Sequence, residues 1–383
     1  MKLVVLTNIL APYRIPLFKA IQRRVDDFSV LLMAAREENR QWQLGAVPFK
    51  TGLLPGFHLK PNGHDVSLHI NYGVLRALRK LDPDIVISGG FGPANLSALL
   101  YCKLFRRKFI GWGHLTLTDG ADASLMRRAV RRWLIGRCDG AIAESSDARD
   151  AFMHYGATYD RVLTCTMPLD VRRIHEKTDA FRNSTRYGEL RAKYPGPVVL
   201  SIGQAIPRKG YRELFQIYER MVALRPDVSL LVIGDGPERA RYERLVMERG
   251  WRRVHFIGFV QSDELHQYLA IADVFVFHTL YDPFGLVLSE AMAAELPAVS
   301  SIYASATRDL IEDGATGFRI DPKEIAISAT MILKVLEMKP EERTAMVLAA
   351  YTKVQQSDAE ASGETIVRFV QSLVRPEMRK GTL

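Results

Sequence analysis

Two acidic residues flank the start of an apolar, helix-like run in YDPFGLVLSEAMAAELP, residues 281–297. On one continuous helix, Asp282 and Glu290 would lie roughly 80° apart around the axis and would not face each other. With Asp282 in the preceding loop and Glu290 about one turn inside the helix, both side chains can reach one cavity. Pro283 favours this arrangement, because a residue before proline avoids the α region. The spacing therefore predicts two acids and a helix start around one ligand.

The chemistry of these groups points to a phosphate beside hydroxyls. Gly285 lacks a β-carbon where a phosphate could approach, and a helix from about Leu286 offers free N–H groups and a favourable dipole. A carboxylate such as Glu290 accepts hydrogen bonds from two vicinal hydroxyls of a ribose, and Asp282 can accept from another polyol. A nucleotide-sugar carries all of these groups. The alternative is that Asp282 only shapes a turn and Glu290 only complements the helix dipole.

Two further loops carry residues suited to the same ligand. QAIPRKG follows the apolar VVLSIG and places Arg208 and Lys209 before a helical segment, where cations and a helix start suit an anion. A solvated loop with ordinary surface charges is the alternative. DGPE follows LLVIG, and Gly236 beside Asp235 allows close approach of backbone to a ligand.

The first half of the chain contributes three more candidate residues. TNILAPYRIPLF follows the first apolar run and contains Tyr13 and Arg14, with Arg14 available to an anion. His114 stands at the end of the apolar FIGWGH, either as a catalytic group or as a structural hydrogen-bonding residue. The three histidines His58, His64 and His69 match no common metal pattern, so we expect no metal site.

Short apolar runs alternate with longer helix-period segments, which is typical of parallel sheets with crossover helices. The expected strands are KLVVLTN, FSVLLMAA, DIVISGG, FIGWGH and GAIAESS in a first domain, and PVVLSIGQ, SLLVIGDG, VHFIGFV, VFVFHT and PAVSSI in a second. The sequence predicts two Rossmann-like doubly wound α/β domains facing each other across a cleft. Ligands of such sheets bind beyond the carboxyl ends of the strands. We place the domains at residues 1–170 and 195–361 with a polar linker at 171–194, and a helix at about 362–383 is a candidate to pack back on the first domain.

Bulk composition narrows the cellular setting. The chain has 383 residues, a hydrophobic fraction of 48% and a formal net charge of +9. No run of about 18 apolar residues and no signal-like segment appears, which predicts a cytoplasmic protein. The cysteines Cys102, Cys138 and Cys165 are widely spaced and are expected to be inert thiols. The basic runs lack interleaved aromatic residues, so nucleic acid is not an expected partner.

Part of the positive charge lies in SLMRRAVRRWLIGR, within a helix expected at residues 125–137. Its apolar residues Leu125, Met126, Ala129, Val130, Trp133 and Leu134 form one stripe, and Arg127, Arg128, Arg131 and Arg132 lie on the other face. Such a helix either packs its stripe on the core with a solvated outer face or attracts an anionic membrane surface.

The motifs SIGQAIPRKG, VIGDGPE, VHFIGFV and LYDPFGLVLSEAMAAELP resemble, in order and spacing, those of GT-B glycosyltransferases of the GT4 (glycogen-synthase-like) family. TNILAPYRIPLF resembles the first loop of a subgroup that assembles bacterial polysaccharides. The resemblance implies the GT-B architecture and a retaining, metal-independent transferase that needs no cofactor. Its substrates would be a nucleotide-sugar, most simply a UDP- or GDP-sugar, and a glycan or polyprenyl-diphosphate-linked acceptor at the inner face of the cytoplasmic membrane.

The resemblance also implies roles for individual residues. Lys209, assisted by Arg208, would neutralise the departing diphosphate, and Asp282 would hold hydroxyls of the donor sugar. Glu290 would bind the ribose, and His114 falls near the active-site histidine of the family, on the acceptor side with Tyr13 and Arg14. The remaining donor contacts would come from Gly203, Asp235, Gly236, Phe259, Val260, Phe284, Gly285 and Leu286.

Three positions depart from the family pattern. Asp282 stands where the family has glutamate, Gln204 stands where it has arginine, and residues 11–14 replace a glycine-rich loop. Two other functions remain open from the sequence. A GT-B epimerase would bind the same nucleotide-sugar without an acceptor, and a two-lobed binding protein would perform no chemistry.

Overall fold

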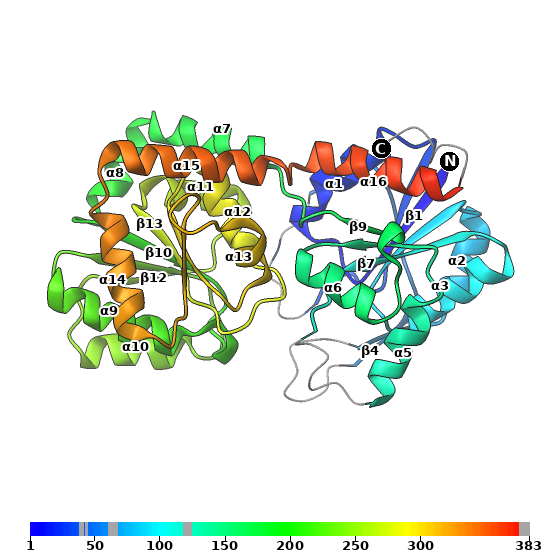
Figure 1. The fold of residues 1–383 in the computed structure, drawn as a ribbon, viewed down its shortest axis with the longest axis horizontal. Helices are drawn as coiled ribbons and strands as arrows, with labels where there is room; N and C mark the ends of the chain where they lie inside the picture. Colours follow the sequence, from blue (N-terminus) through cyan, green and yellow to red (C-terminus); the bar gives the residue numbers. More distant parts are fainter. Residues whose placement is uncertain (38–41, 43–44, 60–67, 118–124, 375–383) are drawn as a thin grey trace. The chain divides into compact units, whose positions relative to one another are not determined.

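The computed structural model describes residues 1–37, 42, 45–59, 68–117 and 125–374, and the chain forms two compact units (Figure 1). Unit 1 comprises Met1–Asp170 and Ala359–Leu383, and unit 2 comprises Val171–Asp358. The expectation of a linker at residues 171–194 is wrong. This segment forms α7 (Val171–Arg182) and α8 (Thr185–Ala192), which pack on α11 (Ser262–Ile271) within unit 2. Its polar, turn-rich composition reflects two helices whose outer faces are exposed.

Unit 1 is built on a seven-stranded parallel sheet of order β3-β2-β1-β6-β7-β8-β9. The strands are β1 (Lys2–Thr7), β2 (Asp27–Leu32), β3 (Lys50–Leu53), β6 (Ile85–Gly89), β7 (Lys108–Gly113), β8 (Gly140–Ala143) and β9 (Val162–Thr164). A separate antiparallel hairpin joins β4 (Gly56–Leu59) to β5 (Leu68–Asn71). The order of the large sheet reverses between β1 and β6, which creates a switch point at the carboxyl ends of these strands.

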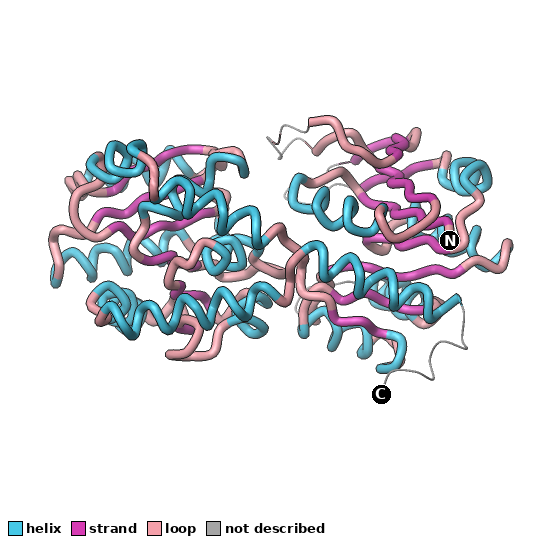
Figure 2. Tube along the Cα trace, turned by 90° about the horizontal axis from the view of Figure 1, so that it is seen from above, coloured by secondary structure: helices cyan, strands magenta, loops and turns pink. Residues whose placement is uncertain are grey.

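Helices flank this sheet in both views (Figures 1 and 2). The helical elements of unit 1 are η1 (Pro12–Arg14), α1 (Ile15–Gln22), α2 (Val74–Leu81), α3 (Pro93–Leu104), α5 (Leu125–Ile135), α6 (Ser146–His154), η2 (Tyr159–Arg161) and α16 (Ala359–Val374). Central strands are buried along their length, as strands covered on both faces should be. One core lies under α1 and α16, and another lies under α2 and α3.

The last described helix, α16, belongs to the core of unit 1. Ile366, Val367 and Val370 are buried in one cluster with Leu17 and Phe18 of α1. The two helices approach so closely that a β-carbon on Gly363 would stand 2.6 Å from the β-carbon of Ala20. The expected helix at about residues 362–383 therefore begins earlier, at Ala359, and residues 375–383 lie outside the described part of the chain.

Unit 2 has a six-stranded parallel sheet of order β12-β11-β10-β13-β14-β15. The strands are β10 (Val198–Ile202), β11 (Ser229–Ile233), β12 (Val254–Gly258), β13 (Val274–Phe277), β14 (Ala298–Ser301) and β15 (Phe318–Ile320). The remaining helical elements are η3 (Pro207–Lys209), α9 (Tyr211–Leu224), α10 (Arg239–Glu248), α12 (Leu286–Ala293), α13 (Ser305–Leu310), α14 (Ile325–Leu336) and α15 (Pro340–Gln355). The order reverses between β10 and β13, so this switch point brings together the loops at residues 203–210 and 278–285.

The structure confirms the α/β class and all ten strands expected from the apolar runs. Three strands of the large sheets were missed. β3 is a mostly exposed edge strand, and β9 and β15 have only three residues each, too few for a hydrophobic pattern. None of the described helices is long and apolar enough to cross a lipid bilayer.

Candidate active site

Lys209 and Asp282 meet at the switch point of unit 2. The Lys209 ammonium forms an ion pair with Oδ2 of Asp282, and each side chain is only 13% exposed. Gly210 explains how the two loops come so close. It has a φ of 71°, and a β-carbon there would stand 2.3 Å from the carbonyl oxygen of His278. The loop after β10 therefore packs directly on the loop after β13.

The carboxylate of Asp282 has a second partner in its own loop. Its Oδ1 accepts a hydrogen bond of 3.1 Å from the N–H of Phe284. Burial acts to raise the pKa of Asp282, but the Lys209 ammonium and this N–H outweigh it, and the pKa lies below its usual range. The backbone N–H of Phe284, expected to contact a phosphate or sugar, is thus already engaged by Asp282.

Gly285 is required by packing rather than by space for a ligand. Its φ is 102°, and a β-carbon would stand 2.4 Å from the ring of Phe277. The sequence interpretation, in which the missing β-carbon made room for a phosphate, is therefore wrong. The Lys209 ammonium lies over the ring of Phe277, and its Nζ is 5.4 Å from the ring centroid. The sequence analysis did not identify Phe277.

The helix after Gly285 begins at Leu286, as expected. No described residue accepts a hydrogen bond from the N–H groups of residues 285–287. Glu290 is the fifth residue of this helix, and burial raises the pKa of its carboxyl group to about 7. Its carboxyl group receives no hydrogen bond from the part of the chain that the structure describes. Both features are compatible with an anion at the helix start and hydroxyls at Glu290.

The other expected donor-side residues lie at the same edge of the sheet. Gly203 follows β10, Asp235 and Gly236 follow β11, and Phe259 and Val260 follow β12. The missing β-carbon of Gly236 would stand 2.6 Å from the carbonyl oxygen of Ala205, so this glycine too serves contact between loops. Arg208 reaches across the same interface, and its Nη1 donates to the carbonyl of Tyr281 at 3.2 Å.

Unit 1 contains a second charged cluster. Arg14 forms a bidentate ion pair with Glu144, whose side chain is fully buried. Nη2 of Arg14 donates to Oε2 of Glu144 at 2.8 Å. Nδ1 of His114 lies 3.2 Å from the same oxygen. The Arg14 guanidinium also lies 4.2 Å from the centroid of the Trp112 ring and 5.3 Å from that of Tyr13.

Electrostatics within this cluster correct the expectation that Arg14 is available to an anion. Burial acts to raise the pKa of Glu144, but Arg14 and His114 hold it at about 2. Both groups of the pair are therefore ionised, and the positive charge of Arg14 is neutralised by Glu144 within unit 1. The sequence analysis missed Glu144, although its position after the apolar GAIA, at a strand's carboxyl end, is a signal that could have found it.

Two of the three histidines considered in the sequence, His58 and His69, lie opposite each other on the hairpin of β4 and β5. Nδ1 of His58 lies 2.9 Å from Nδ1 of His69, whose Nε2 lies 3.2 Å from a Glu37 oxygen. His64 lies outside the described residues. Within the described ranges, no group of three or more histidine, cysteine or acidic side chains is placed to hold a metal ion.

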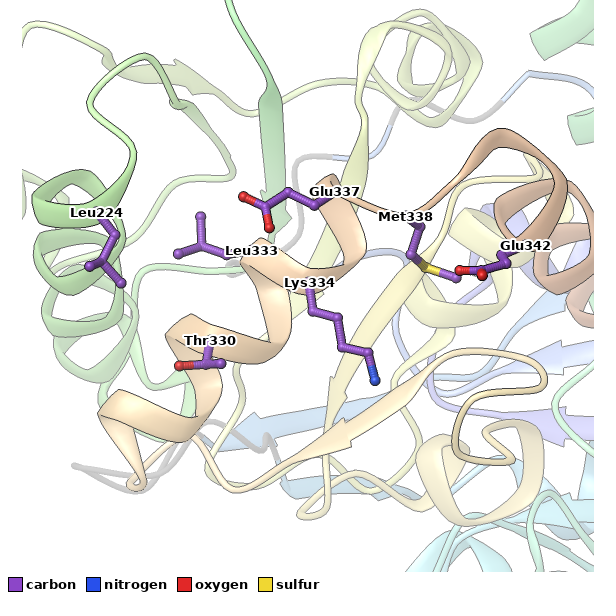
Figure 3. A pocket seen from close by; sticks show the side chains of 7 residues that line it. All are labelled: Leu224, Thr330, Leu333, Lys334, Glu337, Met338 and Glu342. Carbon is purple, nitrogen blue, oxygen red and sulfur yellow. The ribbon is translucent and has the colours of Figure 1, made fainter.

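A hollow of about 520 Å³ lies on unit 2 away from these loops (Figure 3). It is formed by α9, α14 and α15, and its lining residues are Leu224, Thr330, Leu333, Lys334, Glu337, Met338 and Glu342. None of the expected site residues contributes to it.

Two protein-family models match the chain, one in each half. Residues 17–173 match "Glycosyltransferase Family 4", and residues 188–353 match "Glycosyl transferases group 1". The whole chain is also similar to solved structures. It superimposes on Anabaena Alr3699/HepE, crystallised with UDP and glucose, with a TM-score of 0.74, 20% identity, and coverage of 97% of this chain and all of the other. The chain has the GT-B fold.

Curated proteins that are named as glycosyltransferases are similar to parts of this chain. Alpha-D-kanosaminyltransferase of Streptomyces kanamyceticus is 28% identical over 189 residues, 46% of this chain and 48% of that protein. Sulfoquinovosyl transferase SQD2 of Arabidopsis thaliana is 29% identical over 310 residues, 78% of this chain and 58% of that protein. The chain thus spans about half the length of these two relatives.

Proposed function

We propose that this protein is a retaining glycosyltransferase that moves a sugar from a nucleotide-sugar to a glycan or polyprenyl-diphosphate-linked acceptor, in the synthesis of a cell-surface polysaccharide. The observation that carries the proposal is the geometry of unit 2. A largely shielded lysine and a helix start, whose N–H groups at residues 285–287 meet no acceptor among the described residues, lie at the carboxyl edge of a doubly wound sheet beside two acids. This set matches a diphosphate flanked by two polyols.

The reaction needs positive charge where the diphosphate departs. As the glycosidic bond breaks, negative charge grows on the leaving phosphate oxygen, and fixed cations and N–H groups stabilise it. Lys209, with Arg208 on the same loop, and the N–H groups of residues 285–287 can supply this term without a metal ion. Removal of one such donor typically lowers the rate by about 10²–10³-fold.

We include retention of the anomeric configuration in the proposal because the resemblance to the family implies it. A carboxylate nucleophile is the usual route to retention, but the Asp282 carboxylate at this edge is engaged by Lys209 and by the N–H of Phe284. We therefore propose attack by the acceptor on the same face from which the diphosphate leaves.

The donor base and the acceptor are proposed from what similar proteins bind or build. The Anabaena protein was crystallised with UDP and glucose, and a relative in Rhizobium meliloti, 34% identical over 126 residues, is a lipopolysaccharide core biosynthesis glycosyltransferase. A UDP- or GDP-sugar is accordingly the proposed donor, and a lipid-linked glycan is the proposed acceptor.

Peripheral attachment to the inner membrane surface rests on α5. Only Leu134 and Ile135 of this helix are buried, whereas Leu125 and Met126 are 82% and 75% exposed beside the arginines. The expected apolar stripe thus does not cover the core at its N-terminal end. An amphipathic helix with exposed apolar and basic residues suits an anionic lipid surface.

The proposal is tested first by ligand stabilisation and then by product analysis. In a panel of UDP-, GDP- and ADP-sugars, a true donor should raise the midpoint of thermal unfolding, because it binds only the folded state. Transfer requires an added acceptor, whereas an epimerase converts the nucleotide-sugar alone and a binding protein leaves it unchanged. Stabilisation by none of these compounds would contradict the proposal.

A further inference from the structure

We propose that Glu144 is a positioning residue that fixes the ring tautomer of His114, so that Nε2 of His114 is presented as a hydrogen-bond acceptor for an uncharged substrate hydroxyl. The nature of the hydroxyl rests on the proposed function. The positioning role rests only on the geometry of unit 1.

Adjacent strands bring the two side chains together. β7 and β8 are parallel neighbours in register at Gly113 and Ala143, so His114 and Glu144 are the next residues on each strand end. The N–H of Glu144 donates to the carbonyl of Gly113 at 3.1 Å, which extends this alignment by one step. The side chains therefore meet on a rigid frame, with His114 45% exposed and Glu144 fully buried.

The ionised carboxylate decides where the imidazole proton lies. A carboxylate only accepts hydrogen bonds, so Nδ1 of His114, 3.2 Å from Oε2, must carry the hydrogen. A neutral imidazole with Nδ1–H has a lone pair at Nε2. Arg14 keeps the carboxylate ionised through its two-pronged ion pair.

The charges around His114 indicate which class of ligand it can bind. Arg14 and Glu144 cancel, and the neighbouring Cys165 thiol stays neutral because burial raises its pKa to about 11. Among the described members of this cluster the charges thus cancel at physiological pH, and the ring nitrogen of His114 that does not face Glu144 is an acceptor. A hydroxyl fits this environment, whereas a phosphate would meet no uncompensated positive charge in the cluster.

The tautomer can be measured without substrate. In the full chain labelled with ¹⁵N-histidine, with His114→Asn for assignment, we expect protonated Nδ1 and unprotonated Nε2 at pH 7.5. Glu144→Gln should shift the hydrogen towards Nε2, because it removes the negative charge beside Nδ1 and leaves a single acceptor oxygen that Arg14 and His114 must share. A hydrogen on Nε2 and none on Nδ1 in the unmodified protein would overturn the proposal. The spectrum of the unmodified protein gives this answer even if the Glu144→Gln variant fails to fold.

Measurements of turnover test separately whether Nε2 of His114 accepts a hydrogen bond from a substrate hydroxyl. Glu144→Gln should lower kcat by about 10²-fold, the lower range for a positioned acid or base, while leaving KM for the nucleotide-sugar within about twofold. The control Glu364→Gln, which removes an exposed pair with Arg368 on α16, should change neither. Unchanged kcat together with a tautomer shifted towards Nε2–H would overturn the acceptor role of Nε2 and leave the positioning role intact. An inactive unmodified protein with the expected tautomer would count against the proposed function instead.

Discussion

The Lys209 ammonium and the Asp282 carboxylate form an ion pair between the loops after β10 and β13, with both side chains largely shielded from water. A diphosphate that binds Lys209 must therefore compete with Asp282. The pair also places opposite charges at one spot, so each residue affects both stability and ligand binding. The first two predictions follow from this coupling.

Lys209→Met should lower turnover by about 10²–10³-fold, since the departing diphosphate loses a fixed cation. The same change leaves the shielded carboxylate of Asp282 without its cationic partner, which typically costs about 3–5 kcal/mol. Urea unfolding should therefore show lower stability as well as the loss of turnover. The double variant Lys209→Met/Asp282→Asn is the matched control, and it should recover most of the stability and none of the turnover. Near-normal turnover in either variant would contradict the role of Lys209.

Asp282→Asn should tighten the binding of a free nucleoside diphosphate. The substitution removes a negative charge that competes for Lys209, and we expect roughly a tenfold lower Kd, equivalent to about 1.4 kcal/mol. A nucleotide-sugar should gain less, because its diphosphate carries less negative charge and its sugar loses a carboxylate acceptor. Calorimetric titration with UDP, GDP and their sugar conjugates measures the difference. Equal or weaker binding of the diphosphates would show that Asp282 does not compete.

Glu290 should make the protein less stable as the pH rises. Its folded-state pKa of about 7 lies above the usual value of 4.5, so the neutral form is the one that the fold favours. Below about pH 4.5 the group is neutral in both states, and above pH 7 it is ionised in both, with the cost of burial present in full. At about 1.4 kcal/mol per tenfold change in proton affinity, the cost is at most about 3 kcal/mol.

Unfolding of Glu290→Gln at pH 5 and pH 8 measures this contribution. The difference in stability between the two pH values should shrink relative to the unmodified protein. Glu341→Gln, at an exposed position in the first turn of α15, serves as the control and should leave the difference unchanged. An unchanged pH dependence in Glu290→Gln would mean that its carboxyl group is well solvated.

Gly285→Ala should destabilise unit 2. A positive φ costs a residue with a β-carbon about 1–2 kcal/mol, and the contact with Phe277 adds about 1–3 kcal/mol of overpacking. The control is Gly188→Ala in α8, where no heavy atom lies within 4 Å of the new β-carbon. Alanine favours a helix over glycine by about 1 kcal/mol, so this control should stabilise the protein. Thermal unfolding of both variants should therefore give shifts of opposite sign.

Membrane attachment through α5 should depend on lipid charge and on two exposed apolar residues. Co-sedimentation with vesicles containing phosphatidylglycerol should exceed that with phosphatidylcholine alone and should fall at high salt. Leu125→Ser/Met126→Ser should weaken it, whereas Ile327→Ser, at a similarly exposed site on unit 2, should not. Binding that ignores lipid charge would contradict the attachment.

The sequence located the loops of unit 2 well because their residues lie next to strong strand signals. Lys209 and Asp282 follow continuous apolar runs, and parallel strands place such positions at one edge. The direct ion pair between them was not predictable, since it depends on loop contacts fixed by Gly210.

Other features could not be read from local patterns. The role of Gly285 depends on the ring of Phe277, and that of Arg14 depends on Glu144, which is 130 residues away in the chain. The pairing of α7 and α8 with unit 2 depends on a few buried side chains, such as Thr178 and Phe181, within a polar segment.

The path of α16 has a consequence for how the chain can be made and divided. Unit 1 is discontinuous in sequence, and its apolar face on α1 stays open until residues 359–374 have left the ribosome, after all of unit 2. Unit 2 is one uninterrupted segment and is therefore the part to express alone. A chain cut at Asp358 would keep every residue of the loops after β10 and β13 and yet leave the apolar face of α1 uncovered, which favours aggregation.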